Sequence, residues 1–243
     1  MNGLVTRLAI VGAMHEEIAA LRPCLAGLRT ERRAARDFHF GRLDGHDVIL
    51  VRCGIGKVAA ATTTAVLLDA FDAGALLFTG VAGGLGAGVH VGDIVVASAL
   101  LQHDMNAEPL FPRWEVPLTG RARFDTDAVW SARLAQASRA LAAANVHADT
   151  AVIHQGLVVS GDRFVATRAE SDQLRAALPD ALAVEMEGAA VAQVCHDFGR
   201  PFGVVRTVSD RADDAAHGDF QRFVRDVAAP YSRDIVRAAL AQR

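Results

Sequence analysis

The sequence is poor in cysteine, in aromatic residues and in net charge of either sign. Its 243 residues include 3 cysteines and 6% aromatic residues, and the formal net charge is -3. Cys24, Cys53 and Cys195 are far apart, with no CxxC pair and no clustered histidines, which argues against a disulfide framework and a metal site. This cysteine usage favours the reducing cytoplasm. A charge so close to neutral favours neither a nucleic acid nor an anionic membrane as partner, because both select basic surfaces.

Long hydrophobic runs are absent as well. The apolar stretch near the N-terminus is too short to cross a membrane, and it leads into His15, Glu16 and Glu17 rather than a small-residue cleavage site. We therefore expect neither a membrane helix nor a signal peptide. The length suits one α/β domain, so we expect a single domain over residues 1–243 whose core needs no metal or disulfide.

Short apolar runs bounded by glycine alternate with helical patterns along the chain. Continuous Val, Ile and Leu runs are typical of strands that helices cover on both faces. The order predicts an α/β fold, a single-domain three-layer α/β/α structure with a mixed central sheet. The expected strands are residues 8–12, 38–43, 47–53, 76–79, 94–97, 152–159, 183–186 and 202–208. The expected helices are residues 15–25, 59–71, 124–144, 168–177, 188–197 and 219–240.

Residues 104–123 do not fit this scheme. The segment contains Pro109, Pro112 and Pro117 and shows neither helical nor strand periodicity. It also contains large apolar side chains that are costly to leave exposed to water together, namely Leu110, Phe111, Trp114, Val116 and Leu118. Two interpretations stay open: the segment packs on its own domain, or it forms a subunit contact or a wall of an active site.

Acidic residues follow several of the expected strands. Glu17 comes after the first strand, Glu187 after residues 183–186, and Asp210 after residues 202–208. Because ligands of α/β sheets gather beyond the carboxyl ends of strands, these carboxylates are expected at one rim. Acids at helix N-termini also complement the helix dipole, so each alone is weak support for a catalytic role. Glu185 and Glu187 are harder to dismiss, because acids at the end of a buried apolar strand are costly unless hydrogen-bonded or functional.

Two glycine-rich stretches carry weaker signals. Residues 54–59, GIGKVA, match the GxGxxA dinucleotide fingerprint, but the next strand ends in Phe78-Thr79-Gly80 without the acid that a ribose would need. We therefore do not expect a nicotinamide cofactor. The stretch 80–88, GVAGGLGAG, is expected either to let backbone N–H groups approach a ligand closely or to form a tight turn after a strand.

Seven segments over almost the whole chain occur in the order and spacing of one protein family. They are GAMHEEI (12–18), GIGKVAAA (54–61), TGVAGGL (79–85), VGDIVVA (91–97), SGDRF (160–164), AVEMEGAAVAQVC (183–195) and VVRTVSD (204–210). In these motifs the chain resembles the bacterial 5′-methylthioadenosine/S-adenosylhomocysteine nucleosidases, within the nucleoside phosphorylase superfamily. VEMEG followed downstream by SD is specific to the superfamily, and GAMxEE points to its hydrolases. The resemblance implies a nucleoside phosphorylase-like fold.

The resemblance also implies hydrolysis of an N-glycosidic bond through an oxocarbenium-like state. Asp210 matches the acid that protonates N7 of the leaving purine, and Ser209 matches the residue that orients its carboxyl group. Glu17 matches the residue that positions and deprotonates the attacking water. Glu187 matches the carboxylate that holds the ribose 2′- and 3′-hydroxyls.

Further positions match the family's substrate contacts. Phe164 would stack on adenine, Val165 would read the base edge through its backbone, and Met186 would lie under the sugar. The remaining expected contacts are Met14, the backbone of Ala82 and Gly83, and the apolar Ile55 and Phe220 around the 5′-alkylthio group.

Partners and departures follow from the same resemblance. It implies a small-molecule nucleoside substrate, no cofactor, and a homodimer with residues 104–123 at or near the interface. The sequence of that segment departs from the commonest family version, which leaves the lining of the 5′ pocket open. Val81 also departs, because many members carry Ser there and a hydroxyl contact near the ribose and water is absent.

Alternative activities remain open. A phosphorylase needs arginine and backbone donors for phosphate at the end of the first strand, where this chain has Glu16 and Glu17, so hydrolysis is favoured. The substrate is open among 5′-methylthioadenosine, S-adenosylhomocysteine, 5′-deoxyadenosine and a futalosine-type nucleoside. A related phosphorylase and a non-catalytic nucleoside-binding paralogue are the other candidates, and the joint presence of Glu17, Glu187 and Asp210 argues against the paralogue.

Overall fold

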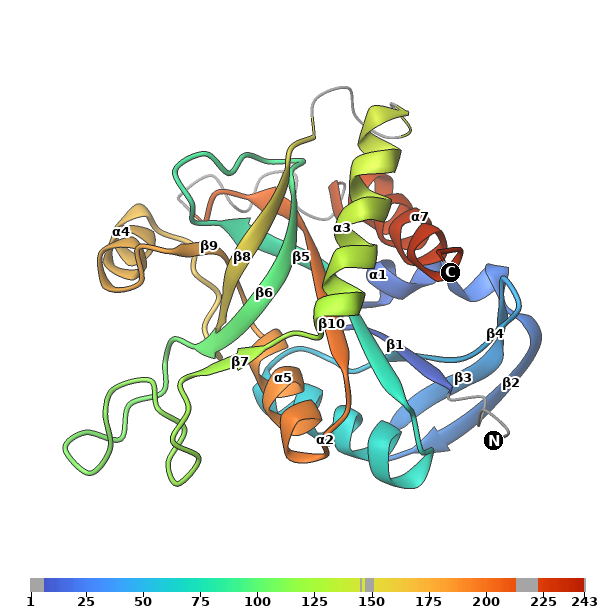
Figure 1. The fold of residues 1–243 in the computed structure, drawn as a ribbon, viewed down its shortest axis with the longest axis horizontal. Helices are drawn as coiled ribbons and strands as arrows, with labels where there is room; N and C mark the ends of the chain where they lie inside the picture. The colour runs from blue at the N-terminus through green and yellow to red at the C-terminus, as the bar shows by residue number, and fades with distance from the viewer. Residues whose placement is uncertain (1–6, 145, 147–150, 213–222, 243) are drawn as a thin grey trace.

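A mixed ten-stranded sheet with helices on both faces forms the described part of the chain (Figure 1). The computed structural model describes residues 7–144, 146, 151–212 and 223–242. The strands follow the order β10-β6-β8-β9-β5-β1-β4-β3-β2, with β7 beside β6. Their bounds are β1 Leu8–Gly12, β2 Ala26–Arg33, β3 Arg36–Leu43, β4 His46–Arg52, β5 Ala75–Gly84, β6 Ile94–Gln102, β7 Arg123–Asp125, β8 Ile153–Ser160, β9 Ala181–Glu185 and β10 Phe202–Asp210.

Helices cover both faces of the sheet, and the helix of residues 168–177 packs separately, with a cluster of β8 and β9 side chains (Figure 1). Their bounds are α1 His15–Ala19, α2 Lys57–Ala65, α3 Ala128–Ala143, α4 Arg168–Ala177, α5 Gly188–Asp197 and α7 Ala229–Leu240, with short 3-10 or π turns at Arg22–Cys24, Val66–Ala70 and Val224–Ala228. α2 packs against α5 on one face of the sheet, and α3 packs against α7, beside α1, on the other (Figure 1). This arrangement confirms the three-layer α/β/α prediction. Within the described ranges, no helix is both long and apolar enough to cross a membrane.

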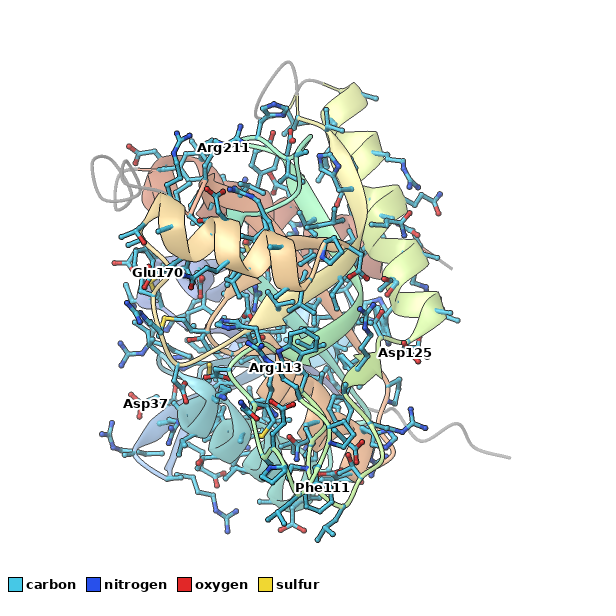
Figure 2. The ribbon with its side chains drawn as sticks, turned by 90° about the vertical axis from the view of Figure 1, so that its left-hand side faces the viewer. Asp37, Phe111, Arg113, Asp125, Glu170 and Arg211 are labelled. Carbon is cyan, nitrogen blue, oxygen red and sulfur yellow. The ribbon has the colours of Figure 1, made fainter. Side chains whose placement is uncertain are left out.

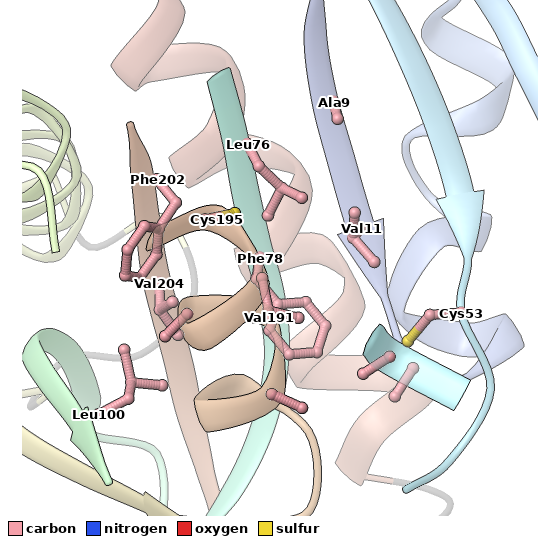
Figure 3. Packing of buried hydrophobic residues seen from close by; sticks show 14 of the residues in the cluster. Ala9, Val11, Cys53, Leu76, Phe78, Leu100, Val191, Cys195, Phe202 and Val204 are labelled. Carbon is pink, nitrogen blue, oxygen red and sulfur yellow. The ribbon is translucent and has the colours of Figure 1, made fainter. Parts of the chain in front are cut away.

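Alternate residues of the central strands pack into two separate hydrophobic cores, one on each face of the sheet. In β1, Ala9 and Val11 join the core under α2 and α5, whereas Leu8 and Ile10 join the core under α1, α3 and α7. Figure 3 shows part of the first core, in which Phe78 of β5 lies beside α5. Because both faces are covered, apolar residues run continuously along the strand, as the sequence pattern indicated.

Closure of five strands into a ring places the carboxyl ends of several strands close together. β10 pairs in parallel with β5 and antiparallel with β6, while β8 links β6 to β9, and β9 returns to β5. In this ring Asp210 is the register partner of Gly83, and Gly83 is also the partner of Val184. The ends of β5, β9 and β10 therefore meet at one point.

Several strand predictions were too short, and one strand was not predicted. β5 continues to Gly84, so the glycine-rich stretch expected to leave the sheet after residue 79 begins inside it. β6 likewise continues to Gln102. Hydrogen bonds from β8, β9 and β10 extend these strands, and such partners are invisible to local sequence patterns. β2 was missed because none of its residues is buried, so it lacks apolar alternation and depends on pairing with β3.

Two helices begin or end at other residues than the sequence predicted. The helix predicted over residues 15–25 ends at Ala19, and Pro23 lies in a 3-10 turn after it, since proline has no N–H for an α-helical hydrogen bond. The helix predicted over residues 219–240 lies partly outside the described residues, and α7 begins at Ala229.

The helix predicted from residue 124 begins later, at Ala128. Asp127 caps it by accepting a hydrogen bond from the Trp130 N–H at 2.9 Å. The residues before the cap pair with β6 as the short strand β7. By contrast, the helices predicted over residues 168–177 and 188–197 are confirmed.

The central position of β1 makes its side chains a test of the fold. We expect Ile10→Ala to lower the free energy of unfolding by about 2–5 kcal/mol, because Ile10 is fully buried and the substitution leaves a cavity. Val129→Ala, on an exposed position of α3, should change it by less than about 0.5 kcal/mol. Urea denaturation measures both, and equal losses would contradict the assigned core.

Candidate active site

One cavity opens where the ends of β1, β5, β9 and β10 meet. Its empty space is about 680 Å³ with the open mouth included. The predicted site residues that line it are Glu17, Glu187, Asp210, Met14, Ile55, Ala82, Gly83, Phe164, Val165, Met186 and Ser209. Phe220 lies outside the described residues. Among the residues described, no group of His, Cys, Asp and Glu side chains could hold a metal ion.

Glu17 occupies a cradle of backbone N–H groups at the end of β1. Its Oε2 accepts hydrogen bonds from the N–H groups of Ala13 at 2.5 Å and Met14 at 2.8 Å. Its Oε1 accepts one from the N–H of Val81 on β5 at 3.1 Å. Burial raises the pKa of Glu17, while the charge of Arg206 and the N–H groups act in the opposite direction. The carboxyl group is therefore held rigidly, with a pKa moved toward the range useful for a general base.

Glu185 and Glu187 lie close in sequence but have different surroundings. Glu185 accepts hydrogen bonds from the Gly188 N–H, at 2.8 and 2.9 Å, and from the Ser160 hydroxyl, so it fixes the start of α5. Glu187 instead accepts the Gly56 N–H at 2.7 Å, across the cavity edge. Burial, and secondly the negative charge of Glu185, raises the pKa of Glu187. Both residues line the cavity, and the contacts of Glu185 also give it a structural role at the start of α5.

Arg206 was not among the predicted site residues, yet it balances the charge of the site. Its side chain is 2% exposed, donates to Glu185 Oε2 at 2.8 Å and lies over the Phe78 ring at 3.9 Å. Its positive charge opposes the rise in pKa that burial causes at Glu17 and Glu187. The sequence feature that could have indicated this role is the position of an arginine inside the apolar run VVRTV, because a buried cation without a partner would be too costly.

Asp210 ends β10 at a register irregularity and is fixed on both oxygens. Ser209 Oγ donates to Oδ2 at 2.8 Å, and the Ala212 N–H donates to Oδ1 at 2.7 Å. A Cβ on Gly83 would lie 3.0 Å from Oδ1, so glycine leaves the space that this carboxyl group needs. The Ser209 hydroxyl therefore contacts the carboxyl group that the resemblance expects it to orient.

Comparison with known proteins places the chain in a family. A family model described as the phosphorylase superfamily matches residues 7–241. A 5′-methylthioadenosine/S-adenosylhomocysteine nucleosidase from Anoxybacillus flavithermus is 40% identical over 232 residues, covering 95% of this chain and 96% of the relative. The chain belongs to this nucleosidase family.

Solved structures agree with that membership. The nucleosidase from Neisseria meningitidis, in complex with methylthio-immucillin-A, has a TM-score of 0.89 and 36% identity, covering 97% of this chain and 98% of its own. A futalosine hydrolase from Helicobacter pylori has a TM-score of 0.87 and 31% identity, with 97% of each chain covered. The fold is nucleoside phosphorylase-like, as the sequence predicted.

Val81 lines the cavity and contacts Glu17 through its backbone, since its N–H donates to Oε1 at 3.1 Å. The effect of the missing hydroxyl near the ribose and water stays a prediction.

The segment 104–123 projects beyond the sheet (Figures 1 and 2). Val116 is buried, and Trp114 packs on the core of β6 and β8, so the segment packs in part on its own domain. Leu110 and Leu118 are 83% and 90% exposed. A subunit contact through these side chains stays a prediction.

The buried Arg206–Glu185 pair makes a stability prediction. Arg206→Met should lower the free energy of unfolding by about 3–5 kcal/mol, because Glu185 is left buried without its cation. Adding Glu185→Gln should recover part of this loss. Arg200→Met, which breaks the more exposed Arg200–Asp72 pair, should cost less than about 1 kcal/mol. Urea denaturation compares the free energy of unfolding of the wild type, Arg206→Met, the double variant and Arg200→Met. A loss of stability in Arg206→Met no larger than that in Arg200→Met would contradict the pairing.

Proposed function

We propose that the protein hydrolyses the N-glycosidic bond of 5′-methylthioadenosine, S-adenosylhomocysteine or both, releasing adenine and the 5′-thioribose product. The observation that carries this proposal is the convergence of Glu17, Glu187 and Asp210 on one cavity, each buried and each accepting a backbone N–H. The relatives described above, which are 5′-methylthioadenosine/S-adenosylhomocysteine nucleosidases, support the substrate class.

Asp210 is the general acid in this proposal. A purine leaves poorly as an anion, so proton transfer to N7 lowers the barrier to breaking the bond to the sugar. The Ser209 hydroxyl and the Ala212 N–H fix the plane of the carboxyl group, so its orientation is set before substrate arrives.

Glu17 and Glu187 act on the sugar side. Glu17 positions the water and takes its proton as it attacks the anomeric carbon, and its raised pKa suits that role. Glu187 accepts hydrogen bonds from the ribose 2′- and 3′-hydroxyls, with Met186 beneath the ring. A carboxylate near the sugar also stabilises the positive charge of an oxocarbenium-like transition state.

The apolar part of the cavity suits adenine and a thioether. Phe164 supplies a ring to stack on the base, Val165 and Gly83 offer backbone groups to its edge, and Ile55 lies toward the 5′ substituent. Met14 and Ala82 complete this wall, and Phe220 is proposed as a further contact of the 5′ group.

Hydrolysis is favoured over phosphorolysis by the position of Glu17. The N–H groups of Ala13, Met14 and Val81 are the type of donors that a phosphate would use at the end of β1. The Glu17 carboxylate already accepts all of them. A phosphate dianion would have to displace this carboxylate and lie beside its charge, which electrostatic repulsion opposes.

The assembly and location complete the proposal. A homodimer with residues 104–123 at or near its interface would cover the exposed Leu110 and Leu118. The substrate partner is a small-molecule nucleoside, with no cofactor, nucleic acid or membrane involved. One domain over residues 1–243 is proposed, and the three free cysteines support the cytoplasm.

Asp210→Asn and Glu17→Gln test the roles of the proposed acid and base. Each should lower the rate of adenine release by about 10²–10⁴-fold, because the group can no longer exchange the required proton. Asp180→Asn, which removes an exposed charge paired with Arg123, should keep the wild-type rate. Wild-type turnover in either site variant, with adenine measured by chromatography, would overturn the role concerned.

Substrate choice needs a separate measurement. Adenine release is compared for 5′-methylthioadenosine, S-adenosylhomocysteine and 5′-deoxyadenosine, and base release for a futalosine-type nucleoside, with and without phosphate. We expect adenine without phosphate from at least one of the first two. Strict dependence on phosphate would indicate a phosphorylase, and release from the futalosine-type nucleoside alone would assign that activity instead.

A further inference from the structure

Lys57 is the only lysine among the 25 Lys and Arg residues of the chain. It begins α2, directly after the turn of residues 54–56, and its side chain is 17% exposed. An ammonium group is a compact charge with three donors, whereas a guanidinium is a planar fork with five donors. The chain thus keeps the compact cation at a single, largely enclosed position.

Lys57 closes a ring of hydrogen bonds with two aspartates. Its Nζ donates to Asp104 Oδ1 at 2.6 Å and to Gln102 Oε1 at 3.1 Å. The other oxygen of Asp104 accepts the Asp162 N–H at 2.9 Å. Asp162 Oδ1 in turn accepts the backbone N–H of Lys57 at 2.7 Å. The ring ties the start of α2 to the segments that follow β6 and β8.

The segments held by this ring also hold the cavity. The residue before Lys57 is Gly56, whose N–H donates to Glu187 at 2.7 Å. A Cβ on Gly56 would lie 3.1 Å from Asp162 Oδ1, so the turn and the Asp162 segment are in close contact. On the cavity side, Ile55 is 61% exposed and Phe164 is 42% exposed, so packing gives them limited support.

The charges of the ring make it stronger than neutral hydrogen bonds. Burial raises the pKa of Asp104, but hydrogen bonds from Lys57 and the Asp162 N–H outweigh it and hold the pKa below its usual value. Asp104 is therefore ionised near neutral pH. Charge-assisted hydrogen bonds are shorter and roughly twice as strong as neutral ones, which agrees with the 2.6 Å contact.

We propose that Lys57 is a positioning residue for the nucleosidase reaction. Through Asp104 and Asp162 it holds the turn of residues 54–56 against the segment that carries Phe164, and so places the Gly56 N–H on Glu187. Lys57 itself does not line the cavity. The proposal rests on the proposed function, because that function assigns Glu187 to the sugar hydroxyls.

A double-mutant cycle tests whether Lys57 acts through Glu187. Lys57→Met should lower kcat/KM by about 10–100-fold, since a displacement of about 1 Å can cost 10²-fold. In a Glu187→Ala background the same substitution should cost less than about threefold, because the group it positions is gone. Arg237→Met, which breaks the distant pair with Asp44, should stay within about twofold of wild type. Equal losses from Lys57→Met in both backgrounds would overturn the proposal.

A structural readout separates this proposal from the proposed function. A crystal structure of Lys57→Met should show the Gly56 N to Glu187 Oε1 distance lengthened from 2.7 Å beyond hydrogen-bond range. An unchanged distance would overturn the positioning role, even if activity had fallen. If the wild-type protein releases no adenine, the proposed function fails, and this distance still decides the role of Lys57.

Discussion

The burial of several acidic side chains at one rim constrains the rest of the site. Removing a carboxylate from water costs much free energy unless hydrogen bonds or opposite charges in the protein replace its contacts with water. These side chains are Glu17, Glu185, Glu187 and Asp210. Backbone N–H groups at strand ends and helix starts supply most of the compensation, and one buried guanidinium, that of Arg206, supplies the countercharge. Compensation is incomplete at Glu17 and Glu187, so burial raises their pKa values, and a raised pKa suits a group such as Glu17 that takes up a proton.

This arrangement depends on the closed ring of strands. β5 lies between β1, β9 and β10, so it can present an N–H to Glu17 near its middle and reach Asp210 near its end. Gly80, with a φ of +153°, is required at the first of these places, because a Cβ there would lie within 2.8 Å of the Glu17 carboxyl carbon. Gly80 and Gly83 of β5 therefore allow the close approach of a carboxylate rather than a turn.

Motif order along the chain predicted most of the candidate site. Glu17, Glu187 and Asp210 were expected at one rim because each follows a strand, and they do share a cavity. Arg206 and Lys57 were not expected to contribute, although both stand out in the sequence, one as a cation in an apolar strand and the other as a solitary lysine. Their importance lies in partners that are remote along the chain, and no local pattern reveals those partners.

The sequence by itself determined the fold class, the two-sided covering of the sheet and the helices over residues 168–177 and 188–197. Helical hydrogen bonds and caps join residues a few positions apart, so local patterns contain the needed information. Only the tertiary structure decided the strand β2, the strand β7 and the continuation of β5 beyond residue 79. The partners of β7 and of the extended β5 lie far along the chain, whereas β2 has no buried residue that would give it a strand pattern. The Arg206 guanidinium on Glu185 and the Gly56 N–H on Glu187 are likewise remote in sequence from the carboxylates they stabilise.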